Sequence, residues 1–281
     1  MEKKEGIAVA NLREKLLFVK KTLQGCGRVL LAYSGGVDSN LLAYLAHETL
    51  GEEALAVTVC SPVFSERERT DAERFAVQIG IPHVMVDFDV FAVDGFAQNP
   101  PDRCYHCKKA LLQTLLDMAA EREIPYVIEA SNLDDESDYR PGLRAIEELG
   151  IVSPLRKAGL TKREIRELSA SFGLPSADKP SLACLATRFP YGETLTPEAL
   201  RRVERAEAFL LRLGFGQFRV RCHGDVARIE VPLCDTDKLL LDRKMIAAQL
   251  KKYGFSYISL DLEGFRSGSM NKGMRSITKG M

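Results

Sequence analysis

Hydrophobic positions in the first two thirds of the chain follow two alternating patterns. Short unbroken apolar runs suit strands buried on both faces, and longer stretches with an apolar residue every three or four positions suit helices. The runs predict strands at 29–33, 54–59, 83–87 and 125–130. The longer stretches predict helices at 8–24, 39–50, 66–79, 105–121 and 161–172. This alternation indicates βαβ units, so we expect an α/β fold with a parallel twisted sheet and flanking helices.

The pattern changes after Gly192, where strands begin to follow one another more closely. We expect helices at 197–213 and 235–252 and strands at 216–222, 225–231 and 256–261. These elements predict a smaller α+β domain. We therefore divide the chain into a first domain over 1–192, a second over 193–265 and a mobile tail over 266–281.

A glycine-rich turn joins the strand at 29–33 to the helix that follows it. The turn consists of Ser34, Gly35, Gly36, Val37, Asp38 and Ser39. Glycines let the backbone approach an anion, and a helix N-terminus offers N–H donors and the positive end of a dipole. Ser34 and Ser39 add hydroxyl donors, and Asp38 can hold Mg²⁺ against phosphate oxygens. The turn lacks the Gly-Lys-Ser/Thr end of a Walker loop, so it predicts a phosphate cradle of another kind. A plain strand-to-helix turn is the alternative.

Composition narrows the class of partner. The chain has 281 residues, 46% hydrophobic and 28% charged, as is usual for a soluble globular protein. Lys plus Arg and Asp plus Glu number 39 each, so no overall basic charge attracts nucleic acid or membrane. No signal-peptide pattern opens the chain, and no segment approaches a membrane span. We expect a cytoplasmic protein with no membrane partner and no nucleic acid partner, although a local basic patch can suffice for the latter.

Seven cysteines, an odd number, do not suggest an extracellular disulfide framework. Cys104 and Cys107 form a C-x-x-C at the entry to a predicted helix, where thiol pKa values are lowered and thiolates favoured. The pair suits a redox couple, a zinc site completed by His106 or Cys184, buried unrelated thiols, or, with Cys184, three ligands of a 4Fe–4S cluster. The remaining thiols are interpreted as packing residues: Cys26, Cys60, Cys222 and Cys234.

Arginines gather on two adjacent strands of the second domain. A two-residue turn at 223–224 would place Arg219 opposite Arg228 and Gln217 opposite Glu230, all on one face. Clustered guanidinium groups are costly to hold together unless an anion joins them, and guanidinium matches phosphate bidentately. The pattern therefore indicates an anion site. A solvated sheet face with Glu230 as a local partner is the alternative.

The turn at 34–39 resembles the PP-loop of the N-type ATP pyrophosphatases, which cut ATP between the α and β phosphates and adenylate a substrate. From about residue 10 to 265 the chain resembles the LarE family of that superfamily. The motifs that carry this resemblance lie at 129–135, 138–142, 153–155, 159–162 and 179–192, the last around Cys184. LarE proteins are ATP-dependent sulfur transferases that help build the nickel-pincer nucleotide cofactor of lactate racemase. The resemblance implies the HUP-like fold of PP-loop enzymes.

The resemblance also implies a reaction and its residues. ATP with Mg²⁺ would adenylate the carboxylates of pyridinium-3,5-dicarboxylate mononucleotide, and sulfur would then displace AMP to give thiocarboxylates. Asp38 and Cys184 are the implied catalytic residues. The implied substrate ligands are Arg219 and Arg221 for the phosphate, with Glu230 and Arg188 as further contacts. The family also implies a homo-oligomer, and the sulfide donor remains unknown.

Two sulfur sources occur within the family. In one branch the cysteine corresponding to Cys184 gives up its own sulfur and becomes dehydroalanine. In the three-cysteine branch, a 4Fe–4S cluster on residues matching Cys104, Cys107 and Cys184 holds an extra sulfide, and we favour this branch. The rival functions are a tRNA thiolase with a PP-loop and an iron–sulfur cluster, an ammonia-dependent adenylating synthetase, and a non-enzymatic ATP-binding sensor.

Overall fold

The computed structural model of the chain describes residues 2–137, 141–180, 182–266 and 270, with side chains from Asn11 onward. The chain forms two compact units. The first contains Met1–Val93 and Cys104–Leu182, and the second contains Asp94–Arg103 and Ala183–Met281. Most of the tail predicted at 266–281 lies outside the described residues.

The division between the units differs from the boundary predicted after Gly192, because the segment 94–103 joins the second unit. Backbone hydrogen bonds explain this placement: Gly192 N donates to Asn99 O at 2.9 Å, and Leu195 N donates to Ala97 O at 2.7 Å. The Asn99 side chain also donates to Pro190 O at 2.6 Å. The second unit also begins at Ala183, before the predicted boundary, so Cys184 belongs to it.

The first unit is built on a four-stranded sheet in the order β3-β2-β1-β4. All neighbouring strands are parallel, which confirms the α/β fold predicted from the alternation. The strands are β1 (Val29–Ala32), β2 (Ala54–Cys60), β3 (His83–Asp87) and β4 (Tyr126–Ile128). The helices are α1 (Glu2–Cys26), α2 (Val37–Leu50), α3 (Glu66–Ile79), α4 (Arg103–Glu121), α5 (Gly142–Glu148), α6 (Pro154–Lys157) and α7 (Lys162–Ser171).

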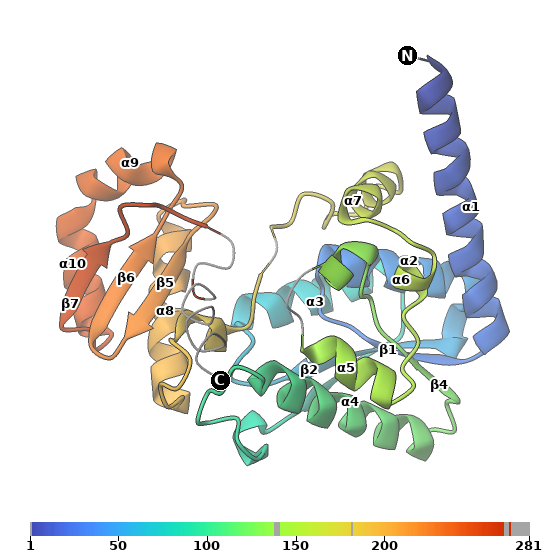
Figure 1. Cartoon of the computed structure of the whole chain (residues 1–281), viewed down its shortest axis with the longest axis horizontal. Coiled ribbons are helices and arrows are strands. Elements are labelled where there is room, and N and C mark those ends of the chain that lie inside the picture. Colours follow the sequence, from blue (N-terminus) through green and yellow to red (C-terminus); the bar gives the residue numbers. More distant parts are fainter. Residues whose placement is uncertain (1, 138–140, 181, 267–269, 271–281) are drawn as a thin grey trace, which may run out of the picture. The chain divides into compact units, whose positions relative to one another are not determined.

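Helices cover both faces of this sheet (Figure 1). On one face, residues of α1, α2, α3, α6 and α7 pack against Val29, Leu31 and Ala56. On the other face, Leu112 and Leu115 of α4 and Ile146 of α5 pack against Leu30 and Val57. Alternate residues of β1 therefore enter opposite cores, as the pleat of a strand requires.

Local signals explain where the helices begin. Ser65 and Glu68 form a capping box at the start of α3, and Thr161 and Glu164 form another at the start of α7. The α2 helix begins at Val37, two residues before the predicted start. Its first turn therefore contains Asp38, which brings this carboxylate to the turn predicted to bind phosphate.

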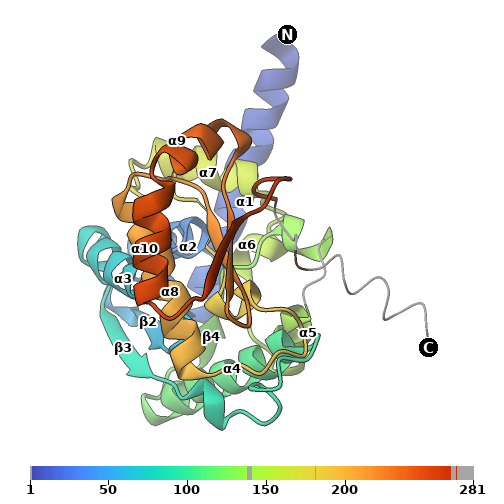
Figure 2. The same cartoon turned by 90° about the vertical axis from the view of Figure 1, so that its left-hand side faces the viewer.

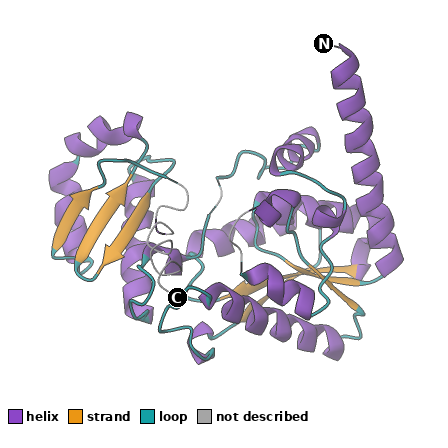
Figure 3. Cartoon of the chain, viewed as in Figure 1, coloured by secondary structure: helices purple, strands orange, loops and turns teal. Residues whose placement is uncertain are grey.

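The second unit contains a three-stranded sheet in the order β5-β6-β7, made of β5 (Arg219–His223), β6 (Val226–Glu230) and β7 (Tyr257–Leu260). The β5–β6 pair is antiparallel and the β6–β7 pair is parallel. Its helices are α8 (Pro197–Arg212), α9 (Thr236–Leu241) and α10 (Arg243–Lys252). The single helix predicted at 235–252 is thus two helices that meet at Asp242. Figures 1 and 2 show α8 and α10 side by side, and Figure 3 shows the three strands together.

Short 3₁₀ helices occur in both units: η1 (Gly51–Glu53), η2 (Val90–Ala92), η3 (Leu133–Ser137), η4 (Leu185–Arg188) and η5 (Leu233–Asp235). Among the described residues, the helices are all too short or too polar to cross a membrane.

Candidate active site

The cradle predicted at 34–39 is shaped by a glycine that no other residue can replace without strain. Gly35 has φ +64°, and a Cβ built on it would lie 2.7 Å from Ala72 Cα in α3. Gly36 is the N-cap of α2, with extended backbone angles. An α-helix leaves its first N–H groups without partners in the helix, so the start of α2 presents donors at this turn.

Polar side chains fix the turn from within. The Ser34 and Ser39 hydroxyls lie 3.1 Å apart, and Ser39 Oγ also donates to Gly36 O at 3.1 Å. Asn40 Nδ2 donates to Gly35 O at 3.2 Å, and the Tyr33 hydroxyl donates to Asn40 Oδ1. Burial raises the pKa of Tyr33, so this hydroxyl keeps its proton and remains a donor.

Asp38 lies between an amide and a lysine from later motifs. Lys162, at the start of α7, forms an ion pair with Asp38 Oδ2, and Asn132 Nδ2 lies 3.4 Å from Asp38 Oδ1. The Asp38 side chain is 22% exposed, so a bound ion and water can reach it. One carboxylate completed by phosphate oxygens and water is a usual Mg²⁺ environment, and Asp38 fits that role.

A second lysine approaches the same turn. Lys179 Nζ donates to Gly35 O at 3.1 Å and forms an ion pair with Asp71 at 2.9 Å, and its side chain is 8% exposed. Sequence reasoning assigned no role to Lys162, Lys179 or Asn132. The available signal was their position in the motifs at 129–135, 159–162 and 179–192.

The C-x-x-C pair occupies the first turn of α4. Cys104 is exposed and Cys107 is half-buried, and none of the seven cysteines forms a disulfide. Residues three apart lie on the same side of a helix, so the two thiols can serve one ligand. Lys108, beside Cys107, lies 3.6 Å from Glu129, which follows β4. Cys234, expected to be a packing residue, is exposed instead.

The third cysteine of the expected cluster belongs to the other unit. Over the ranges that the structure describes, no three His, Cys, Asp or Glu residues come together as a metal-binding group. Thiolates are the appropriate donors for an iron–sulfur cluster, so the residue types fit. The gathering of Cys104, Cys107 and Cys184 around one cluster stays a prediction.

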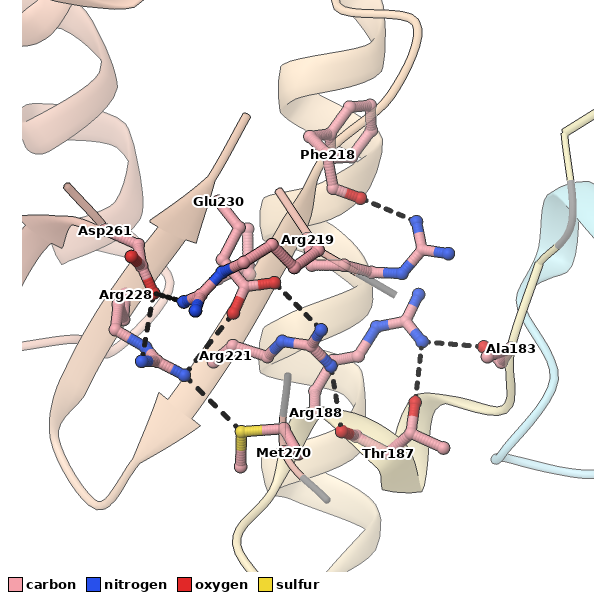
Figure 4. A network of polar contacts seen from close by, with 12 residues as sticks. Ala183, Thr187, Arg188, Phe218, Arg219, Arg221, Arg228, Glu230, Asp261 and Met270 are labelled. Atoms are coloured by element: carbon pink, nitrogen blue, oxygen red, sulfur yellow. Dashed lines mark hydrogen bonds and ion pairs between the residues drawn. The ribbon is translucent and has the colours of Figure 1, made fainter. Parts of the chain in front are cut away.

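Cys184 begins the turn that leads into η4. Its carbonyl oxygen accepts hydrogen bonds from Thr187 N at 2.9 Å and Thr187 Oγ1 at 2.7 Å. Arg188 Nη1 lies 3.3 Å from the same oxygen and donates to Ala183 O at 2.7 Å (Figure 4). Arg188, expected to contact substrate, is thus 2% exposed and bound to the backbone carbonyls of Ala183 and Cys184.

The β5–β6 hairpin turns one residue later than predicted. Arg219 pairs with Glu230 and Arg221 with Arg228, so the predicted partners of Arg219 and Glu230 are wrong. Gly224, with φ +57°, supplies the left-handed conformation that this turn uses. Because the shift changes each partner by two residues, the arginines still share one face of the hairpin.

The arginine face is a buried network, not a solvated surface. Glu230 is fully buried and lies 2.8 Å from Arg221 and 3.4 Å from Arg228. Arg221 also donates to Thr187 O at 3.0 Å, and Arg228 pairs with Asp261 at 3.0 Å (Figure 4). The solvated face of the alternative is therefore wrong, whereas its local partner, Glu230, is confirmed.

Arg219 carries positive charge in an unfavourable place. Burial lowers its pKa to about 10, and the neighbouring charge of Arg188 acts in the same direction. Its guanidinium donates to Phe218 O at 2.6 Å and lies 5.2 Å from the Phe265 ring centre. A bound anion would relieve this cost, because it supplies charge and acceptors together.

Comparisons with known proteins extend along most of the chain. The family described as NAD synthase matches residues 11–121. A pyridinium-3,5-bisthiocarboxylic acid mononucleotide synthase of Lactiplantibacillus plantarum is 37% identical over 264 residues, covering 94% of this chain and 96% of that protein. An uncharacterized protein of Synechocystis is 43% identical over 263 residues, covering 93% of this chain and 98% of that protein. A tRNA-specific 2-thiouridylase of Rickettsia felis is 28% identical over 190 residues, covering 54% of this chain and 52% of that protein.

Proposed function

The chain belongs to the LarE family of PP-loop enzymes, and from this premise we propose that it is an ATP-dependent sulfurtransferase. Its proposed substrate is pyridinium-3,5-dicarboxylate mononucleotide, whose carboxylates become thiocarboxylates. The observation that carries the proposal is the contact between Arg221 and the carbonyl of Thr187, in the turn that begins at Cys184. A phosphate anchor beside a thiol-bearing turn suits sulfur transfer to a phosphorylated substrate.

In the first step, a substrate carboxylate oxygen attacks the α-phosphorus of ATP. A new P–O bond forms, the bond to the bridging oxygen breaks, and pyrophosphate leaves with the electron pair. The α2 N-terminus, Ser34 and Ser39 would bind the phosphates, and Asp38 would hold Mg²⁺. When bound, Mg²⁺ supplies charge that stabilises the leaving pyrophosphate. Lys162, released from Asp38 by the ion, would then be available to the phosphates.

In the second step, a sulfur nucleophile attacks the adenylated carbonyl carbon. The C–S bond forms, the bond between the carbonyl carbon and the AMP oxygen breaks, and AMP leaves as an anion. Arg219 and Arg221 would hold the substrate phosphate during both steps. Charge-assisted bidentate contacts fix orientation as well as affinity, and correct orientation lowers the barrier to attack.

We propose further that Cys104, Cys107 and Cys184 hold a 4Fe–4S cluster. When bound, such a cluster would supply sulfide from an iron that no cysteine occupies. Support comes from the donor chemistry and from the placement of Cys104 and Cys107 three residues apart near the start of α4, where both thiols can serve one ligand. The other source within the family is Cys184 itself: its sulfur would displace AMP, and loss of the Cα proton with cleavage of the Cβ–S bond would then leave dehydroalanine and release the thiocarboxylate.

An anaerobic assay of iron and acid-labile sulfide, with protein mass before and after turnover, separates these sources. Three-cysteine ligation predicts bound iron that is lost in Cys104→Ala, Cys107→Ala and Cys184→Ala alike. Sacrificial transfer predicts iron-free protein, a requirement for Cys184 alone, and loss of the mass of hydrogen sulfide after one cycle.

The adenylation step has a separate test. Wild-type protein with MgATP should release AMP and pyrophosphate only when the dicarboxylate mononucleotide is present. Release of ADP, or release that requires tRNA, would contradict the proposal.

A further inference from the structure

A buried ion pair in the second unit reaches the turn that carries Cys184. Arg188 Nε and Nη2 each lie 2.9 Å from a carboxylate oxygen of Glu207 in α8, a bidentate arrangement. The Arg188 side chain is 2% exposed and that of Glu207 is 15% exposed. Such a pair is held in a fixed geometry, because the planar guanidinium matches the carboxylate along two parallel bonds.

The remaining nitrogen of Arg188 is directed at the chain around Cys184. Nη1 donates to Ala183 O at 2.7 Å, lies 3.3 Å from Cys184 O and contacts Thr187 Oγ1 at 2.9 Å. A guanidinium has five N–H donors, and every nitrogen of this one has a partner within the protein. Arg188 would have to break these bonds to bind substrate, so a positioning role fits it better than the expected substrate contact.

Glu207 connects the same turn to the strand of the phosphate-binding arginines. Val220 N donates to Glu207 Oε1 at 3.0 Å, and Val220 stands between Arg219 and Arg221 in β5. From the other side, Arg221 donates to Thr187 O. The backbone that carries Cys184 is thus tied to β5 through Glu207 and through Arg221.

We propose that Arg188 and Glu207 are positioning residues for Cys184. They fix the turn 183–188 against β5, so that the Cys184 thiol keeps a constant position relative to Arg219 and Arg221, the proposed phosphate ligands. The inference rests on the proposed sulfurtransferase function and applies whether Cys184 ligates a cluster or donates its own sulfur. The pair acts chiefly on the sulfur-transfer step, and because Glu207 also bonds to β5, substrate binding should change to a smaller extent.

Two single variants and one double variant test this role. Arg188→Lys keeps the positive charge but loses the planar guanidinium that makes two parallel bonds to Glu207. Glu207→Gln keeps the shape of the side chain but loses its negative charge. The double variant Arg188→Met/Glu207→Leu removes both charges, which often preserves stability when a buried pair is replaced by apolar residues. Ile246→Val, on the buried face of α10, is the matched control because it weakens the same unit from a helix that carries neither member of the pair.

Three readouts are measured on each folded variant. Hydrogen exchange at the Thr187 amide, which bonds to Cys184 O, reports the order of the turn. Calorimetry with the mononucleotide reports binding, and single-turnover assays report pyrophosphate and thiocarboxylate formation separately. We expect faster exchange at Thr187 and about 100-fold slower sulfur transfer in the pair variants. Mononucleotide binding should weaken much less, and pyrophosphate formation at saturating substrate should be unchanged. Ile246→Val should leave sulfur transfer, binding and pyrophosphate formation at wild-type values.

Other outcomes would overturn the inference. Weaker mononucleotide binding in Arg188→Lys, with unchanged exchange at Thr187, would make Arg188 a substrate ligand. Full sulfur transfer by the double variant would show that the pair positions nothing that the reaction uses. If wild-type protein forms no adenylate, the proposed function fails, and unchanged exchange in the pair variants would then separately refute the positioning role.

Discussion

Replacing Gly35 with alanine perturbs the phosphate cradle at the point where the structure is least tolerant. The new Cβ would lie 2.7 Å from the Ala72 backbone, and φ at this position is +64°. Left-handed backbone costs an L-residue about 1–2 kcal/mol, and overpacking adds about 1–3 kcal/mol. We therefore expect Gly35→Ala to lower the stability of the first unit by about 2–5 kcal/mol.

Gly36→Ala is the matched control for stability. A Cβ at Gly36 would meet only Ser34 Oγ, at 3.4 Å, and the backbone there is extended. Loss of a favourable N-cap glycine and reduced entropy of the unfolded chain oppose each other, each by about 0.5–1 kcal/mol, so little net change is expected.

Urea unfolding followed by circular dichroism measures this difference, with transitions fitted separately because the two units need not unfold together. Calorimetry with MgATP on the folded protein then tests whether the displaced turn still binds phosphate. The first unit should unfold earlier in Gly35→Ala than in Gly36→Ala, and ATP binding should be weakened in Gly35→Ala. Equal stability of the two variants and unaltered ATP binding by Gly35→Ala would refute the assigned geometry.

Two further substitutions test separate parts of the site, and a third tests an ion pair outside it. Asp38→Ala should abolish pyrophosphate release while the circular dichroism spectrum stays native, because its partly exposed carboxylate is expected to hold Mg²⁺; residual wild-type release would contradict that role. Arg219→Ala should weaken mononucleotide binding about ten- to a hundredfold in calorimetry and leave ATP binding intact, since one charge-assisted contact contributes about 1.5–3 kcal/mol; equal losses for both ligands would argue against a substrate-phosphate contact. Hydrogen bonds from Lys109 and Tyr105 lower the pKa of Glu148 to about 2, below its ordinary value of 4.5. The wild type should therefore lose stability as the pH falls from 4.5 towards 2, and Glu148→Gln should show less of this loss in acid titration.

Much of the first unit follows from the sequence because its signals are local. The apolar run at 83–87 and the helical pattern at 66–79 match β3 and α3 as the structure has them. The capping box at Thr161 fixes the start of α7. The cradle at 34–39 was also predictable, since strand, glycine-rich turn and helix are contiguous in the sequence.

Features that depend on distant contacts were not predictable in this way. Lys162 reaches Asp38 across 124 positions, and Lys179 reaches Gly35 across 144. The attachment of 94–103 to the second unit depends on bonds from Asn99 to residues about ninety positions away. The prediction of the β5–β6 register failed for another reason. The turn near Gly224 can shift by one residue while the same side chains still face the same side of the hairpin.

The central claim is that this chain replaces carboxylate oxygen with sulfur at the expense of ATP. Mass spectrometry of the pyridinium-3,5-dicarboxylate mononucleotide after anaerobic incubation with the protein, MgATP and sulfide tests it most directly. We predict product masses in which one and then two oxygens are replaced by sulfur, with one AMP and one pyrophosphate formed for each replacement. Stoichiometric pyrophosphate release with an unchanged or amidated mononucleotide would contradict the claim.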